Sequence, residues 1–164
     1  MNGLDLLKRG WEHAYGTEDW YAPLKDAVSG ISAEQASWRP PGEAGNTIWE
    51  TVNHLVYYKQ RLLEQLQGEE PDNWAKNNDD TFKTPDTHGS EEAWQRTLRE
   101  LDAVHTRIGS LLGAKSDPDM DAVYRDSPIG FRIGSVIQHD AFHTGEIVLI
   151  RKLQGSWPAT RHYE

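Results

Sequence analysis

The chain contains no cysteine, and this absence removes several kinds of chemistry at once. Without thiols there can be no disulfide, no thiolate metal site, no iron–sulfur cluster and no cysteine nucleophile. A bound metal ion would therefore have to be held by histidine and carboxylate side chains. The sequence has seven histidines, so this kind of site stays open.

Positive charge is also scarce. Lys and Arg total 17 against 26 Asp and Glu, which gives a formal net charge of −9. Proteins that bind nucleic acid or anionic membranes gain affinity by neutralising phosphates, and this balance has the wrong sign for that. The histidines are mostly uncharged at neutral pH and do not reverse it. We therefore expect neither nucleic acid nor a membrane as a partner.

Long apolar runs are missing as well. The densest aliphatic run, residues 147–150, is far shorter than the roughly 20 residues that span a bilayer. The first ten residues lack the continuous apolar stretch of a secretory signal. We therefore expect a cytoplasmic protein.

The length of 164 residues and the hydrophobic share of 37% predict one globular domain, residues 1–164. A domain of this size can bury a core without disulfides or a structural metal. Any bound metal would therefore be functional.

Four segments show the three- and four-residue apolar spacing of amphipathic helices. A short helical turn is predicted after Ser32, a long connection over residues 69–88, and either a short hairpin or an extended cover over residues 123–131. The sequence thus predicts an all-α fold, a four-helix bundle with long connections. Its helices are expected at about 4–28 with a bend at Gly16-Thr17, 48–67 after a cap at Asn46 or Thr47, 91–113 after a cap at Ser90, and 132–154 before Gly155.

The last of these helices contains His139 and His143, two imidazoles one turn apart. At about 100° per residue, both rings and Glu146 lie on the apolar face of the helix. This spacing suits two-point coordination of one metal ion. The structural alternative is a pair of partly buried core histidines, but polar groups facing a core need partners.

A third ligand would have to come from another helix, where His54 is available. On the helical wheel His54 lies on the flank of the apolar stripe, beside Tyr58. From the pattern alone we expect a solvent-facing His54.

These residues resemble the DinB superfamily, damage-inducible four-helix proteins that include thiol-dependent transferases. The resemblance spans nearly the whole chain and implies a DinB-like bundle. It also implies that His54, His139 and His143 bind a divalent metal, zinc or nickel, with open positions for water or substrate. The residues that carry it are the run 49–55 and the motif His139-x-x-x-His143-x-Gly145-Glu146-Ile147 leading to Arg151.

Two features depart from the family pattern. The family often has a second histidine beside the last ligand, where this chain has Phe142 and Thr144 around His143. It also has Gln after the glycine, where this chain has Glu146. The ligands are unaffected, and the differences fall on the groups around them.

Three neutral imidazoles would leave the ion positively charged with at least one vacant position. Such an ion lowers the pKa of water or of an incoming thiol. With no cysteine in the chain, the thiol would arrive on a small cosubstrate. The sequence thus predicts a metal-dependent thiol transferase or hydrolase that acts on a small-molecule substrate. One alternative is a non-catalytic stress-response protein that binds a metal or a ligand. The other is a structural bundle without a metal. A homodimer is expected, as in related bundles.

The residues around the motif have several candidate roles. Glu146 is a candidate base, an acceptor for a ring N–H or a fourth ligand, with a surface salt bridge to Arg132 or Arg151 as the alternative. Asp140 is expected on a solvated helix face rather than orienting an imidazole, and Tyr58 is expected to pack rather than line the site.

The residues outside the motif are expected to have structural roles only. Lys59 is expected to reach solvent from the apolar stripe. The seven tryptophans are interpreted mostly as core residues and loop anchors. The remaining histidines are interpreted as surface or packing residues: His13, His88, His105 and His162.

Overall fold

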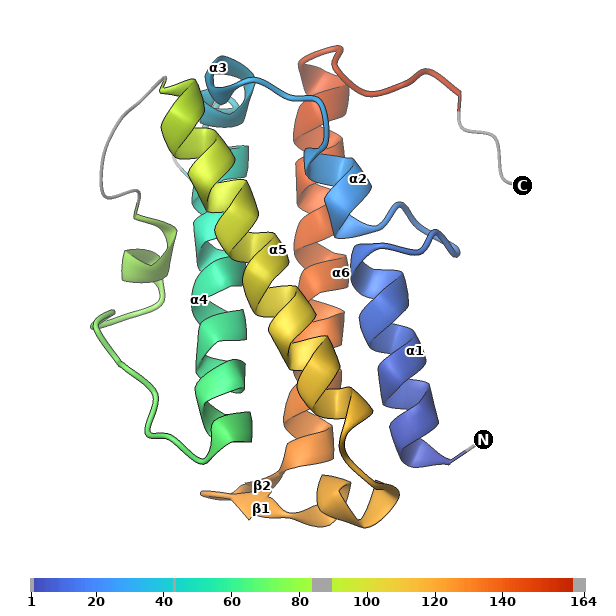
Figure 1. The fold of residues 1–164 in the computed structure, drawn as a ribbon. Helices are drawn as coiled ribbons and strands as arrows, with labels where there is room; N and C mark the ends of the chain where they lie inside the picture. Colours follow the sequence, from blue (N-terminus) through green and yellow to red (C-terminus); the bar gives the residue numbers. More distant parts are fainter. Residues whose placement is uncertain (1, 43, 84–89, 161–164) are drawn as a thin grey trace.

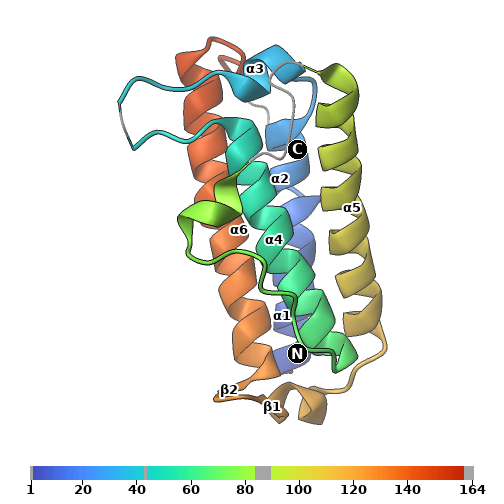
Figure 2. The same cartoon turned by 90° about the vertical axis from the view of Figure 1, so that its left-hand side faces the viewer.

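Long helices dominate the protein and pack side by side in a bundle (Figures 1 and 2). The computed structural model describes residues 2–42, 44–83 and 90–160. The predicted all-α fold is confirmed. The elements are α1 (Gly3–Tyr15), α2 (Leu24–Val28), α3 (Ala33–Ser37), α4 (Ile48–Gln67), η1 (Asp79–Phe82), α5 (Glu91–Gly113), η2 (Asp117–Asp121), β1 (Val123–Tyr124), β2 (Ser127–Pro128) and α6 (Ile129–Leu153).

Local capping signals explain where the helices begin and end. The Thr47 hydroxyl accepts the backbone N–H of Glu50, and the Glu50 carboxylate accepts the backbone N–H of Thr47. Gly68 ends α4 in the left-handed region at φ 77°, which favours a residue without Cβ. Ser90 caps α5 and Ser32 caps α3, as the sequence predicts.

The predicted first helix is wrong in its extent. It ends at Tyr15, and the chain does not become helical again until Leu24. The break begins at Gly16 and ends at Pro23, which lacks the N–H of a helix interior and instead precedes the first turn of α2. Two elements therefore replace one bent helix.

The segment before the last helix forms a hairpin, one of the two predicted alternatives. Val123 pairs with Pro128 and Tyr124 with Ser127 in an antiparallel register. The hairpin leads directly into α6 at Ile129, three residues before the expected start. In the described part of the chain, no helix is long and apolar enough to cross a membrane.

The core consists of two apolar clusters at different levels of the bundle. One cluster contains Leu55 and Trp94, and the other contains Ile108 and Ile133. On α4 and α6, Lys59 and Asp140 lie between the residues of the two clusters. A buried polar layer therefore separates the two clusters.

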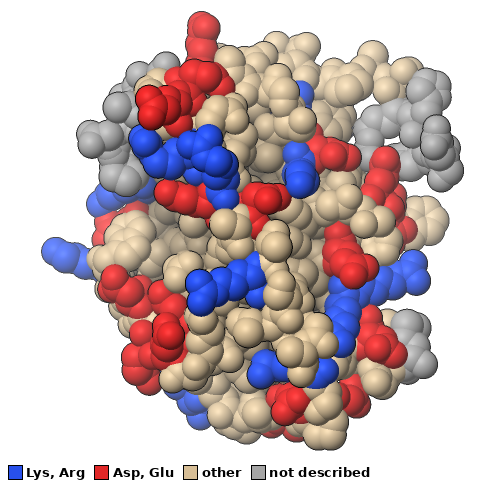
Figure 3. Space-filling model, in the orientation of Figure 1, with Lys and Arg blue, Asp and Glu red and all other residues tan. Residues whose placement is uncertain are grey.

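This layer corrects two predictions. Lys59 does not reach solvent and Asp140 is not solvated, because both side chains are 0% exposed and form an ion pair with each other. A helical wheel assigns each residue to a face of its own helix and contains no information about a counter-charge on a neighbour. On the face drawn in Figure 3, Lys and Arg are interspersed among Asp and Glu.

Candidate metal centre

Three imidazoles from two helices meet between α4 and α6. His54 Nε2 lies 2.9 Å from His139 Nε2, and His143 Nε2 lies 3.1 Å from the same atom. One ligand atom from each ring falls within 4.8 Å of the others. The turn-by-turn spacing of His139 and His143 aims both rings at one point, and α4 packs against α6 so that His54 reaches it.

His54 is only 3% exposed, so the solvent-facing position expected from the wheel is wrong. The covering group comes from the connection after α4. The Phe82 ring stacks on the His54 ring with centroids 3.9 Å apart and an angle of 12° between the planes. A wheel contains only the residues of its own helix, so it cannot register a later segment that folds back over a flank.

The same connection fixes the tautomer of His54. The Thr81 hydroxyl donates its proton to the backbone carbonyl of Asn78 at 2.5 Å. Its oxygen therefore accepts the Nδ1–H of His54, at 2.6 Å. With the ring proton on Nδ1, the lone pair of Nε2 points to the point where the three rings meet.

His143 is oriented in an equivalent way by a carboxylate. Glu146 Oε2 lies 2.5 Å from His143 Nδ1 and accepts its N–H. The surface salt bridges considered for Glu146 are not formed. Arg132 pairs with Asp126, and Arg151 donates to backbone carbonyls.

A divalent cation fits this arrangement. The Nε2 atoms of His54 and His143 each present a lone pair. The Nε2 atom of His139 lies close to both and can donate at most one proton. At least one of the two short N···N contacts therefore has no hydrogen bond of its own. Tetrahedral zinc with Zn–N bonds of about 2.0–2.1 Å separates its nitrogen ligands by about 3.3 Å, close to the contacts found here.

Burial favours the neutral rings that metal binding requires. Burial, and then the neighbouring His139 and His143, lower the pKa of His54 to about 3. Burial, then His143 and Lys59, lower the pKa of His139 to about 4. Both rings are therefore uncharged at neutral pH with their lone pairs available.

Aromatic rings line the centre. The Tyr58 ring stands edge-on to His54 and His139, with centroids 4.9 and 5.2 Å away, and its hydroxyl donates to Asn78. Tyr58 therefore lines the site, contrary to the packing role expected for it. Phe142 stands edge-on to His143 at 5.0 Å and is 64% exposed. It marks the boundary between the centre and solvent.

The remaining candidates do not belong to the histidine cluster. Asp140 pairs with Lys59, and Thr144 donates its hydroxyl proton to the backbone carbonyl of Asp140. His105 packs between the rings of Trp11 and Tyr15, as a structural histidine should. His13 lies 3.7 Å from Asp19, whereas His88 and His162 lie outside the described residues.

Three residues of the connection, Asn78, Thr81 and Phe82, complete the site without having been predicted. They lie in the long connection after α4, outside any periodic pattern, and no motif in the sequence points to them.

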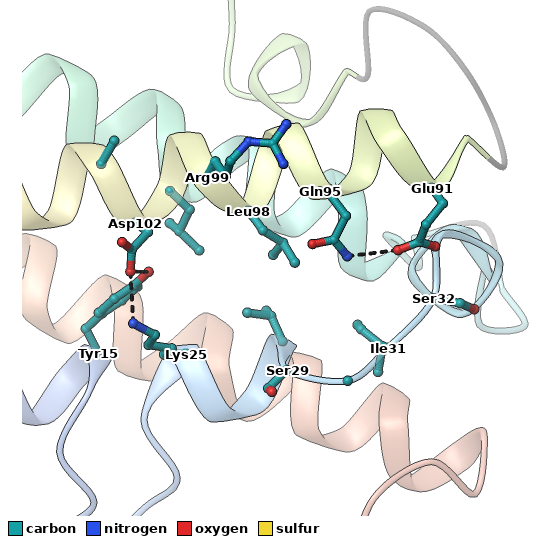
Figure 4. A pocket seen from close by; sticks show the side chains of 14 residues that line it. Tyr15, Lys25, Ser29, Ile31, Ser32, Glu91, Gln95, Leu98, Arg99 and Asp102 are labelled. Atoms are coloured by element: carbon teal, nitrogen blue, oxygen red, sulfur yellow. Dashed lines mark hydrogen bonds and ion pairs between the residues drawn. The ribbon is translucent and has the colours of Figure 1, made fainter.

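A cavity lies on another side of the bundle, between α5 and the segment from α2 to α3 (Figure 4). Its volume is about 730 Å³, and none of the three clustered histidines lines it. At one end Asp102 accepts hydrogen bonds from Tyr15 and Lys25. This cavity is separate from the histidine centre.

Comparison with known proteins gives one family. No curated protein and no solved structure gave a significant match to the chain. The family model of the DinB superfamily matches residues 18–147, a segment that contains His54, His139 and His143. The matched segment covers most of the chain and agrees with the resemblance of its motifs. The protein belongs to the DinB superfamily.

Proposed function

We propose that this protein is a divalent-metal-dependent enzyme that transfers a low-molecular-weight thiol to a small electrophile, with His54, His139 and His143 as the metal ligands. The observation that carries this proposal is the convergence of three Nε2 atoms, two of which have their lone pairs fixed inward by Thr81 and Glu146. Imidazole suits several divalent ions, and we propose zinc or nickel.

The protein supplies orientation and shielding. Thr81 and Glu146 hold two rings in place, while Tyr58, Phe82 and Phe142 surround them with apolar surface. An ion held by neutral imidazoles keeps its charge and lowers the pKa of a thiol near it. Since the chain has no cysteine, the thiol belongs to a cosubstrate.

The position of Glu146 favours a thiol over water as the nucleophile. Its carboxylate is engaged by Nδ1 of His143, the ring nitrogen that does not face the other imidazoles. Among the described residues, the cluster at the centre contains histidines alone. A thiol has a lower pKa than water and needs less help from a base, so a centre without a free carboxylate suits thiol transfer better than hydrolysis.

We also propose a homodimer formed through α6. Phe131, Phe142, Leu149 and Leu153 are all more than half exposed and follow one line along this helix. Phe131 and Leu153 lie eleven residues on either side of Phe142, so an antiparallel copy would place Phe131 against Leu153. With aromatic side chains contributing about 150 Å² each, the line offers roughly 500 Å² per copy, which approaches a standard interface once its neighbours are added.

The metal content of protein purified without a metal-chelating resin or a histidine tag tests the proposed ligands. We expect about one equivalent in the wild type and none in His54→Ala or His139→Ala, while His13→Ala, a histidine outside the cluster, retains the metal. Metal retained in His54→Ala would remove His54 from the ligand set. No metal in the wild type after reconstitution would overturn the proposal.

Activity is the second test. Metal-loaded wild type is assayed for loss of thiol with a panel of small thiols and alkylating or epoxide electrophiles. We expect turnover that disappears in His139→Ala. Turnover of esters, amides or lactones without any thiol would replace the transferase with a hydrolase. Saturable ligand binding with the ligand recovered unchanged would favour a non-catalytic binding protein.

A further inference from the structure

A groove between α4 and α6 leads away from the metal centre toward the hairpin. It has a volume of about 280 Å³ and begins at Tyr58, whose ring also contacts His54 and His139. It continues between Leu62 on α4 and Val136 on α6 and reaches Ser127 in β2. The groove therefore begins beside the histidine centre, which it meets through Tyr58 alone among the residues that line it, and runs toward one end of the bundle.

Two arginines line this groove at the same level along the bundle. Arg61 follows His54 by seven residues on α4, and Arg132 precedes His139 by seven residues on α6. Because α4 and α6 run in opposite directions, as Figure 1 shows, both steps lead the same way along the bundle. Seven residues correspond to about 10.5 Å of helix and return nearly to the same face. Each arginine thus lies about two turns from a metal ligand, on the side that faces the groove.

Neither arginine is neutralised by a buried carboxylate. Among the described residues, Arg61 has no carboxylate partner, and its guanidinium donates to the Tyr57 hydroxyl at 3.2 Å. Arg132 pairs with Asp126, whose side chain is 89% exposed, so water competes for the carboxylate and weakens the pair. Its Nε is buried without a partner.

Apart from the exposed Asp126, the surroundings of the groove do little to balance this charge. Within the described part of the chain, no Asp or Glu lines the groove, although the sequence carries a net charge of −9. The other polar groups along it are Gln65, Ser127 and Ser135, which can donate hydrogen bonds to an anion. Two arginine forks beside hydroxyl and amide donors are a typical arrangement for binding a carboxylate.

We propose that the groove is an anion-binding subsite, in which Arg61 and Arg132 hold a carboxylate of the molecule whose reactive atom approaches the metal. The inference rests on the proposed function for the identity of the reactive atom, but the subsite itself needs no metal. The volume of the groove, about 280 Å³, corresponds to roughly nine water molecules. It therefore suits a small, extended organic acid.

Binding of succinate, a dicarboxylate without a thiol, tests the subsite directly. The titration is followed by calorimetry and by shifts of backbone amide resonances, in metal-loaded wild type and in metal-free His139→Ala. We expect saturable binding in both, with shifts at residues along the groove. Arg61→Gln and Arg132→Gln should each weaken binding at least tenfold, whereas Arg107→Gln on the outer face of α5 should not change it.

A matched pair of thiols tests the connection with the metal centre. The thiols 6-mercaptohexanoate and 6-mercaptohexanol differ only in the terminal carboxylate. In metal-loaded wild type the acid should bind at least tenfold more tightly than the alcohol. Arg61→Gln should remove this difference while leaving the affinity for the alcohol unchanged. Unfolding curves of each variant verify that the arginine substitutions leave the fold intact, and Arg61→Lys should restore part of the preference.

The outcomes separate the two proposals. Succinate binding that is unchanged in Arg61→Gln and in Arg132→Gln overturns the subsite. Succinate binding that occurs only in metal-loaded protein overturns it as well, because the anion would then bind the metal. Arginine-dependent succinate binding by a protein that holds no metal after reconstitution supports the subsite and refutes the metal-dependent function.

Discussion

Replacing Asp140 by Asn should destabilise the protein strongly, because it leaves the charge of Lys59 in the core without its partner. Both side chains are 0% exposed, and the Lys59 ammonium also lies 3.4 Å from His105 Nδ1 and 4.3 Å from the centroid of the Trp11 ring. Breaking a buried ion pair by removing one partner costs about 3–5 kcal/mol. For a chain of this length, each kcal/mol shifts Tm by roughly 2–4 °C, so we expect Tm to fall by about 6–20 °C.

The double variant Lys59→Met/Asp140→Leu separates the loss of the pair from the loss of its charge balance. Replacing both partners by apolar side chains of similar size is often neutral or stabilising. We therefore expect the double variant to lie near the wild type in free energy of unfolding, well above Asp140→Asn. Urea denaturation followed by circular dichroism, with a chelator present in every sample, measures this without a contribution from bound metal.

The pH dependence of Asp140→Asn provides a further check. Burial lowers the pKa of Lys59, and Asp140 opposes this shift. Without the carboxylate the pKa falls further, so the unfolded chain binds the proton more strongly than the folded one. Stability of the variant should then rise from pH 7 toward pH 10 relative to the wild type. A variant within 1 kcal/mol of the wild type at pH 7, or a double variant as unstable as the single one, would refute the buried charged pair.

Three other predictions concern the centre, the dimer and acid stability. Thr81→Ala and Glu146→Ala, which remove the acceptors of two ring N–H groups, should each weaken metal binding about 10–100-fold in competition with a chelator; unchanged affinity would argue against their orienting role. Phe142→Ser should yield an 18.7 kDa monomer by light scattering, and a wild type that is itself monomeric would contradict the proposed interface. Burial, then Lys59, lower the pKa of His105 to about 2, so below pH 6.5 the unfolded chain takes up a proton that the folded chain does not. Its contribution to stability should therefore fall as the pH drops from 6.5, by up to about 1.4 kcal/mol per pH unit, and urea titrations of His105→Phe should show an acid slope smaller than that of the wild type by this amount.

The sequence predicts the features of this fold whose causes lie within a few residues. The cap of α4 at Thr47, its stop at Gly68 and the cap of α5 at Ser90 each depend on contacts spanning three or four positions. The His139–His143 pair is of the same kind, since one turn of helix is enough to bring the rings together. Such features can be recognised in the local sequence because the residues in contact are only three or four positions apart.

The features that the pattern missed depend on distant segments. His54 is buried because Thr81 and Phe82, which follow it by 27 and 28 positions, pack over it. Lys59 is buried in an ion pair with Asp140, which lies 81 positions away in the sequence. A wheel assigns each side chain to a face according to its own helix alone. The family resemblance placed His54 beside the other two histidines because it carries spatial information that one helix cannot contain.

The position of the centre follows from the way the bundle divides its core. Two apolar clusters lie at its two levels, and the polar layer between them holds the Lys59–Asp140 pair next to the histidines. Side chains in such a layer contribute little net stability, because desolvation offsets most of their attraction. The clusters on either side supply the burial that keeps the helices together, so the histidines can be arranged for a ligand rather than for packing. A metal ion present at 100 times its Kd would then add about 2.7 kcal/mol to the free energy of unfolding, because binding stabilises a site that the apolar clusters have already formed.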